Sequence, residues 1–216
     1  MKRIVAVVMI VVCLLGIVSV ANAKLLDVFH PYISAGYAYG WDLKGYGLDA
    51  ESMASGKEAW GYDLKAGIDL LPYFAIEREY LELKGFKDTT VTNISSYLWI
   101  ANWAVDYKIM ISNLKLRYPF KAKNVKITPV FTLGKGDADM TWKEDYEYKS
   151  SFRYIIGSSN GKVSLPCYKT GGGVDVEIKH FRVSLEYSYL DIKNTNGTGK
   201  NGNIVSVLML GVSYKI

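Results

Sequence analysis

The stretch Ile204–Ile216, IVSVLMLGVSYKI, indicates how the whole chain folds. Counted back from the last residue, alternate positions are apolar and most positions between them are small or polar. This is the pattern of a β-strand with one apolar face. Because the apolar row continues to the last residue, an open sheet would carry an unpaired apolar edge that promotes aggregation. A closed barrel removes that edge by pairing the last strand with the first, so we predict a closed barrel.

The N-terminus predicts export. Lys2 and Arg3 precede an apolar run over residues 4–20, and residues 21–23 read Ala-Asn-Ala, which is the pattern of a secretory signal peptide with its cleavage site. We therefore expect cleavage before Lys24, with residues 1–23 as the signal peptide and residues 24–216 as one domain. The alternative is an uncleaved anchor, but the run is short for a membrane helix, which needs about 20 apolar residues.

The composition excludes several classes of protein. The formal net charge is only +5 and no basic residues cluster, so we expect no nucleic-acid partner. The chain after residue 23 has a single cysteine, Cys167, which excludes an internal disulfide. We expect a free thiol in a loop, and the alternative is a disulfide with another molecule. Tyrosine is abundant, with 17 Tyr against 7 Phe and 5 Trp. An apolar ring with a polar tip suits a membrane interface.

Alternating apolar and polar residues recur along the chain. The stretch 59–70 is the most regular. Its apolar side consists of Trp60, Tyr62, Leu64, Ala66, Ile68 and Leu70, and its other side of Gly61, Asp63, Lys65, Gly67 and Asp69. We predict about eight strands, at residues 32–41, 59–70, 73–84, 97–118, 125–136, 170–178, 181–189 and 204–216. One such strand also fits a soluble sheet, and the repetition of the pattern favours a membrane barrel.

Long polar loops and short turns alternate between the predicted strands. The loops are residues 42–57, 85–96, 137–168 and 194–203, and the turns lie near residues 71–72, 119–124 and 179–180. This asymmetry is typical of outer-membrane barrels, which have short turns on one side of the membrane and long loops on the other. A soluble lipocalin-like barrel would direct its apolar face inward instead. Here the face opposite the apolar one carries glycines and charges, which suits a polar lumen.

Two residues do not fit the strand pattern. Arg78 falls on the apolar face, where a charge costs about 2 to 4 kcal/mol at the membrane midplane, so we expect snorkelling or a bulge there. Pro129 lies inside a predicted strand although every barrel strand is paired on both sides. We expect a local irregularity at this position.

The chain resembles the small eight-stranded outer-membrane barrels of the OmpA/OmpX type. The matching pieces are YISAGYAYGW (32–41), NLKLRYPF (113–120), GGGVDVEI (171–178), FRVSLEYSYL (181–190) and VLMLGVSYKI (207–216). The resemblance implies an all-β, closed, antiparallel up-and-down barrel in the outer membrane of a Gram-negative bacterium. It also implies contact with outer-membrane lipid and lipopolysaccharide, recognition of the last strand by the assembly machinery, and a monomer. In that family the last residue is usually Phe or Trp, whereas this chain has Ile216.

The predicted inward faces carry a nearly balanced set of charges. They are Asp63, Asp69, Glu77, Glu79, Asp175, Glu177 and Glu186 against Lys65, Lys115, Arg117, Lys126, Arg182 and Lys215. Eight strands leave an interior that side chains can just fill, and buried charges there must be paired. As the lumen charge network we select Lys65, Glu79, Lys115, Arg117, Arg182 and Glu186. The network either fills and stabilises the lumen or gates a narrow pore.

The sequence shows no catalytic, cofactor or metal site. Barrel enzymes use a histidine near the outer rim, whereas His30 and His180 are both expected at the side of the short turns. We therefore expect no enzyme and no cofactor. The aromatic and charged residues 140–154 either contact a receptor, the matrix or lipopolysaccharide, or extend the strands above the membrane. Three functions remain open: an envelope or adhesion-like surface barrel, a narrow porin-like channel for small solutes, and a barrel enzyme.

Overall fold

The computed structural model describes residues 29–42, 58–94, 97–122, 125–151, 153–193 and 203–216. Within these ranges the chain forms nine strands. They are β1 (His30–Asp42), β2 (Glu58–Leu71), β3 (Phe74–Ile94), β4 (Tyr97–Arg117), β5 (Phe120–Ala122), β6 (Val125–Ser150), β7 (Tyr154–Ile178), β8 (Phe181–Ile192) and β9 (Asn203–Lys215). The expected signal peptide lies outside the described residues. Among the described residues, no helix has the length and apolar character needed to cross a membrane.

Eight of the strands close into a ring, and the short β5 pairs with the start of β6. The long strands pair antiparallel with their neighbours along the chain, and β4 pairs directly with β6. The last strand, β9, lies between β8 and β1, where Ile33 faces Tyr214 and Asp42 faces Val205. The prediction of an all-β, closed, antiparallel up-and-down barrel is therefore confirmed.

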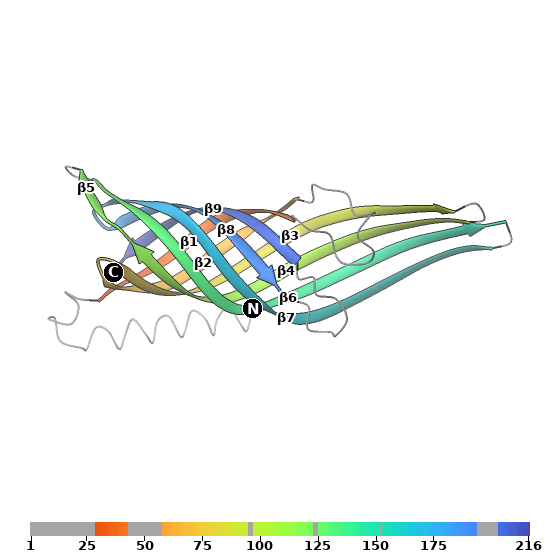
Figure 1. Ribbon diagram of the computed structural model, residues 1–216, viewed down its shortest axis with the longest axis horizontal. Coiled ribbons are helices and arrows are strands. Elements are labelled where there is room, and N and C mark those ends of the chain that lie inside the picture. The colour runs from red at the N-terminus through yellow and green to blue at the C-terminus, as the bar shows by residue number, and fades with distance from the viewer. Residues whose placement is uncertain (1–28, 43–57, 95–96, 123–124, 152, 194–202) are drawn as a thin grey trace.

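The two ends of the barrel differ in length. At one end, here called the turn end, short connections join β2 to β3 and β7 to β8, and the C-terminus lies there. At the other, the loop end, β3, β4, β6 and β7 continue past the remaining strands (Figure 1). We call this extension the arm. It consists of residues 86–94, 97–105, 137–150 and 154–166, whose strand partners all lie within β3, β4, β6 and β7.

The arm corrects two expected loops. Residues 85–94 and most of residues 137–168 are strands, not loops. Cys167 consequently lies in β7 and is buried, which contradicts the expected thiol in a loop. Within residues 140–154, β6 continues to Ser150 and β7 begins at Tyr154, so the predicted strand extension is present.

A bulge at Gly85 explains why the end of β3 was missed. The pairing of β3 shifts between Leu83 and Phe86, and Gly85 has a φ of 95°, a conformation that glycine adopts readily. The extra residue changes which positions face inward. Leu81 and Leu83 face in before the bulge, and Phe86 faces in after it, so a strict two-residue period ends at Gly85.

An inversion of polarity explains why the ends of β6 and β7 were missed. Up to Leu133, the outward positions of β6 are apolar and exposed. Beyond that point the outward positions are charged, beginning with Lys135 and Asp137, while Ala138 and Met140 face in. An apolar-outside pattern therefore stops fitting where the strand leaves the apolar band.

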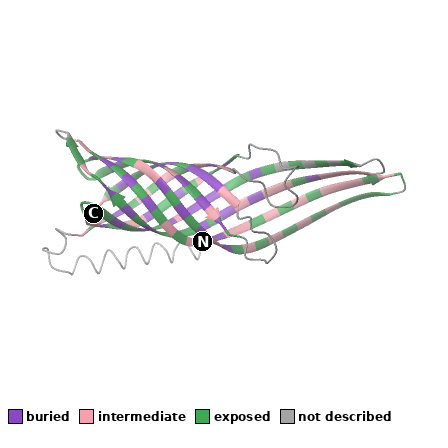
Figure 2. Ribbon diagram, viewed as in Figure 1, coloured by how far each residue is buried: buried purple, intermediate pink, exposed green. Residues whose placement is uncertain are grey.

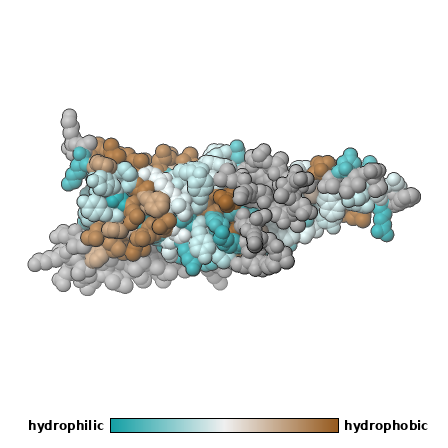
Figure 3. All heavy atoms as spheres, viewed as in Figure 1, coloured by the Kyte–Doolittle hydropathy of each residue, from teal (hydrophilic) through white to brown (hydrophobic). Residues whose placement is uncertain are grey.

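The outer surface carries an apolar band over the part of the barrel near the turn end (Figure 3). Outward side chains such as Leu64, Ile76, Leu185 and Leu210 are exposed large hydrophobics. Aromatic residues gather at its margins, for example the contacting pair Tyr73 and Tyr118 at the turn end. Such a band with aromatic margins is typical of a barrel surrounded by lipid.

Both exceptions to the pattern have local explanations. Arg78 is exposed on the apolar band without a register shift, and its guanidinium donates to Ser112 Oγ at 2.7 Å and to Met110 Sδ at 3.3 Å. Since Met110 lies on the loop-end side of Ser112, the side chain snorkels towards the loop end and no bulge is present. Pro129 pairs with Val174 in regular register. The expected irregularity is on the side of Pro129 that faces β4. The regular pairing of β4 ends there at Arg117, and the Tyr118 amide donates to the Pro129 carbonyl.

The interior divides into two halves along the barrel axis. Buried positions alternate along the barrel strands, as the purple bands in Figure 2 show. In the half towards the loop end, these buried side chains form an apolar core. Its members include Ala38, Leu81, Leu83, Tyr107, Ile109, Ile111, Leu165, Cys167, Leu190, Val207 and Met209. The half towards the turn end holds the charged side chains. The expectation of a polar lumen therefore holds for only half of its length.

Candidate functional site in the barrel lumen

The alternation of strand residues places the predicted charges inside the barrel. All six residues selected from the sequence are buried: Lys65, Glu79, Lys115, Arg117, Arg182 and Glu186. Lys65 comes from β2, Glu79 from β3, Lys115 and Arg117 from β4, and Arg182 and Glu186 from β8. The structure distributes them over two clusters that follow one another along the axis.

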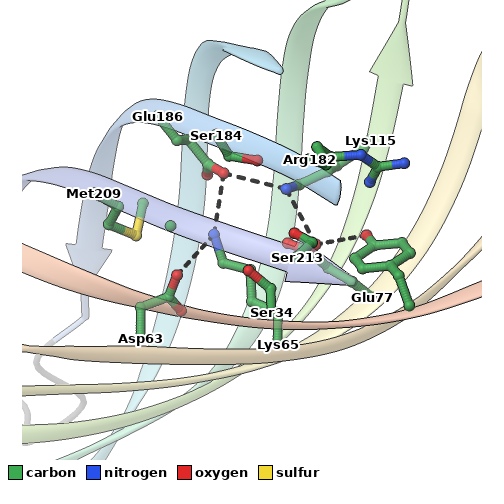
Figure 4. Close-up of a pocket in the computed structure, with 12 residues that line it drawn as sticks. Ser34, Asp63, Lys65, Glu77, Lys115, Arg182, Ser184, Glu186, Met209 and Ser213 are labelled. Carbon is green, nitrogen blue, oxygen red and sulfur yellow. Dashed lines mark hydrogen bonds and ion pairs between the residues drawn. The ribbon is translucent and has the colours of Figure 1, made fainter. Parts of the chain in front are cut away.

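The inner cluster, next to the apolar core, is organised by Glu186 and Glu79. Glu186 Oε2 lies 3.2 Å from both Lys65 Nζ and Lys115 Nζ. Lys65 Nζ also lies 3.0 Å from Asp63 Oδ2, so its ammonium sits between two carboxylates (Figure 4). This arrangement compensates the buried charges, which would otherwise be costly away from water.

Lys169 is the member that the sequence analysis missed. It is fully buried, and its Nζ lies 2.7 Å from Glu79 Oε2 and 2.7 Å from Glu186 Oε1. The sequence pattern predicts a strand only from Thr170, because the apolar-outside alternation does not extend through residues 154–169. The alternation itself was the usable signal, since Lys169 shares an inward face with Gly171 and Asp175.

The outer cluster, at the turn end, is organised by two arginines. Arg117 lies 2.7 Å from both Asp69 and Glu177. Arg182 also pairs with Asp69, and its Nε lies 3.1 Å from Glu177. Lys215 of the last strand completes the cluster at 2.6 Å from Glu177. The guanidinium groups suit this position because each can donate to several carboxylates at once.

Tyr32 connects the two clusters. Its hydroxyl donates to Glu77 at 2.8 Å, and the Arg182 guanidinium lies 4.7 Å from the centroid of its ring. Glu77 in turn lies 3.0 Å from Lys115 Nζ in the inner cluster. The charges therefore form one connected set, in which Lys169 brings the bases to seven and balances the seven acids.

Little open space remains between these side chains. The cavity lined by Lys65, Lys115 and Glu186 has a volume of about 10 Å³, which is about the space of one water molecule. Towards the loop end the apolar core follows directly. A filled, charge-balanced lumen with an apolar second half can hold its strands together.

No arrangement for catalysis or metal binding is found in the described part of the chain. His30 begins β1 and His180 lies in the turn between β7 and β8, so both lie exposed at the turn end. No three His, Cys, Asp or Glu side chains in the described ranges come together as a metal site.

The match to a family model supports the fold. The family model for the outer membrane protein beta-barrel domain matches residues 10–215. The chain is similar to the solved structure of Ail, the attachment invasion locus protein of Yersinia pestis, with 17% identity, a TM-score of 0.49 and coverage of 87% of this chain and 98% of that chain. It is also similar to Neisserial surface protein A, with 15% identity, a TM-score of 0.47 and coverage of 87% and 97%. Among curated proteins, no sequence matches significantly.

Proposed function

Because the chain belongs to the family of outer membrane protein beta-barrel domains, we propose that it is an integral outer-membrane barrel with a closed lumen. Its role is to support the envelope and to present the arm as a surface for adhesion-like interactions. The observation that carries the closed lumen is the filled interior, in which one connected charge network is followed by an apolar core. The arm supports the surface role, because it projects beyond the end of the other strands (Figure 1).

Planar bilayer recording tests the closed lumen. The purified protein, reconstituted in a bilayer, is expected to show no steady conductance, because ions would have to pass both a paired charge network and an apolar core. Matched control bilayers contain the heat-denatured protein, so that adventitious leaks are recognised. A steady, ion-selective conductance would contradict the proposal and favour the alternative, a narrow channel for small solutes.

The proposal includes the route to the membrane. Residues 1–23 are removed as a signal peptide, and the barrel is formed by residues 24–216. The assembly machinery recognises the C-terminal strand, and the monomeric barrel contacts outer-membrane lipid and lipopolysaccharide through its apolar band. Membrane fractionation is expected to recover a protein whose first residue is Lys24 and whose gel mobility changes on boiling. Recovery in the soluble periplasm without a mobility shift would contradict this location.

A further inference from the structure

One face of the arm is aromatic. The positions that face the lumen in the barrel continue along the arm, and there they hold two pairs of rings. Trp103 and Trp142 have centroids 6.1 Å apart, and Trp142 packs against the apolar core. Farther from the barrel, Trp99 and Tyr146 are stacked at 5.2 Å with planes within 10°. The opposite face of β6 is polar and charged over the same length.

Glycines on β7 make room for these rings. A Cβ at Gly161 would lie 2.7 Å from Cε2 of Trp142, and the ring of Tyr146 occupies the space that a side chain at Gly157 would need. The two rings therefore lean from β6 over β7. Ser159 lies between the two glycines, so the floor between the aromatic pairs carries only a small side chain there.

Among the described side chains, one carboxylate, that of Glu144, lies between the two aromatic pairs. Glu144 pairs across the sheet with Trp103 on one side and with Ser159 on the other. Its strand neighbours on the same face are Trp142 and Tyr146, whose Cα atoms are roughly 13 Å apart at the usual strand rise. Glu144 is partly buried, and burial raises its pKa, with no cation offsetting the lost hydration.

Glu144 has no ion pair or hydrogen bond among the described residues, in contrast to the acids of the lumen. On the arm, Asp139 pairs with Lys162 and Asp145 with Lys143, both on the opposite face. No described side chain on the aromatic face carries a positive charge. A partly buried carboxylate between electron-rich rings gives this face a local negative potential that is not compensated within the described chain.

We propose that Trp99, Trp103, Trp142, Tyr146 and Glu144 bind a quaternary ammonium group of the choline type. Ring faces attract such a cation, and the carboxylate adds a Coulomb attraction. Among the described side chains, the acceptors besides Glu144 are few, since Ser159 and Tyr146 contribute one hydroxyl each. A primary ammonium brings three donors and a guanidinium five, which would be left partly unpaired, whereas a trimethylammonium group brings none. The chemistry of the site therefore favours the quaternary cation.

Titration with tetramethylammonium chloride tests the site. The full barrel is purified in an alkyl glucoside detergent, because a phosphocholine detergent would compete. Saturation transfer from the protein to the methyl protons, together with tryptophan fluorescence, should give one saturable binding curve. Sodium chloride at the same ionic strength should give none, and choline should displace the probe. An affinity for methylguanidinium or methylammonium equal to or above that for tetramethylammonium would overturn the choice of ligand.

Two variants and one matched control assign the binding to these residues. Glu144→Gln should weaken tetramethylammonium binding about fivefold or more, and Trp103→Leu about threefold. Glu147→Gln makes the same chemical change three residues along the same strand but on the opposite face, and it should change the affinity less than about twofold. All three should keep the heat-dependent gel shift. Equal affinities for Glu144→Gln and Glu147→Gln would overturn the proposal.

This inference deepens the proposed surface role of the arm, and its failure is distinguishable from failure of the closed lumen. Binding to the purified barrel depends on the arm alone, while conductance depends on the lumen. No saturable signal with the wild type would overturn the ammonium site and leave the closed lumen standing. A conducting barrel that still binds tetramethylammonium would overturn the closed lumen alone.

Discussion

Lys169 shows at the scale of one residue how the lumen is held together. Its ammonium is fully buried between Glu79 and Glu186, which come from β3 and β8 on different parts of the ring. Glu79 has Asn113 as a further close partner, and its distance to Lys65 Nζ is 4.0 Å. The loss of Lys169 would therefore leave a buried carboxylate poorly compensated, which is more costly than the loss of an exposed pair.

The first prediction follows from this burial. Lys169→Ala should lower the free energy of unfolding by about 3 kcal/mol, because it leaves two buried carboxylates without their shared cation. Lys149→Ala, at an exposed position of the arm, should change it by less than about 0.5 kcal/mol. Urea unfolding of the barrel in lipid vesicles, followed by tryptophan fluorescence, measures both. Equal, small losses would mean that water in the lumen screens these charges.

The sequence predicts the residues of the lumen network only where the two-residue alternation of a strand is visible. Lys65, Lys115 and Arg117 lie in strands with an unbroken alternation, and the structure places them inside. Lys169 lies where the outer face meets water instead of lipid, so hydropathy no longer identifies the outward positions. Partners such as Glu79 and Lys169 are also 90 residues apart. Their contact depends on the closure and stagger of the ring, which local patterns do not specify.

At the scale of the strands, Gly85 sets the register of the arm. Its positive φ accommodates one extra residue in β3, and a side chain there would meet no atom within 4 Å, so the constraint is conformational and not steric. Before the bulge, the odd-numbered residues Leu81 and Leu83 face the core. After it, the even-numbered Phe86 faces the core.

The second prediction tests this conformational role. Gly85→Ala should lower the free energy of unfolding by about 1 to 2 kcal/mol, since other L-residues avoid the left-handed region. Gly211→Ala is the control, because a Cβ there would make only ordinary contacts, the nearest at 3.4 Å. Thermal unfolding of the refolded barrels, compared side by side, gives the difference. A Gly85→Ala barrel as stable as wild type would show that the bulge does not depend on glycine.

The third prediction concerns the closing strand. Deleting residues 212–216 removes the pairs of β9 with β1 and β8 at the turn end and the contact of Lys215 with Glu177. Folded barrel should be lost, because two strand edges and part of the charge network are left open. Ile216→Phe keeps the hydrogen bond that the backbone N–H of residue 216 donates to the Pro31 carbonyl, and it should keep or raise the folded yield. The heat-dependent gel shift measures the yield, and normal folding of the shortened chain would contradict the role of β9.

The sequence predicts the barrel strands correctly where the lipid-facing and lumen-facing positions differ in polarity. β2, β8 and β9 have this contrast over most of their length, and their predicted and observed bounds differ by a few residues. The arm lacks it because water replaces lipid outside, while rings and apolar residues occupy the inner face. Along β6 and β7 the outer face therefore changes from apolar to polar. As a result, the amino-acid composition of the arm resembles that of a polar loop.

At the scale of the whole molecule, the barrel and the outer part of the arm are separate in their interactions. The closed ring and the charge network link strands from the whole chain, and only the base of the arm, for example Phe86 and Ala138, contributes to the apolar core. The outer part of the arm pairs only within its own four strands. We therefore expect the barrel to fold without it.

The last prediction tests this separation by shortening both hairpins of the arm. Short turns replace residues 90–101 and 144–159, so that the pairs Thr89–Asn102 and Lys143–Asn160 close the new hairpins. Trp103 and Trp142 remain, and with them the packing of Trp142 against the core. The shortened barrel should keep its heat-dependent gel shift and lack conductance, because its lumen is unchanged, but it should lose saturable tetramethylammonium binding together with Glu144. A shortened chain that does not fold, while Glu144→Gln does, would show that the arm is needed to close the barrel.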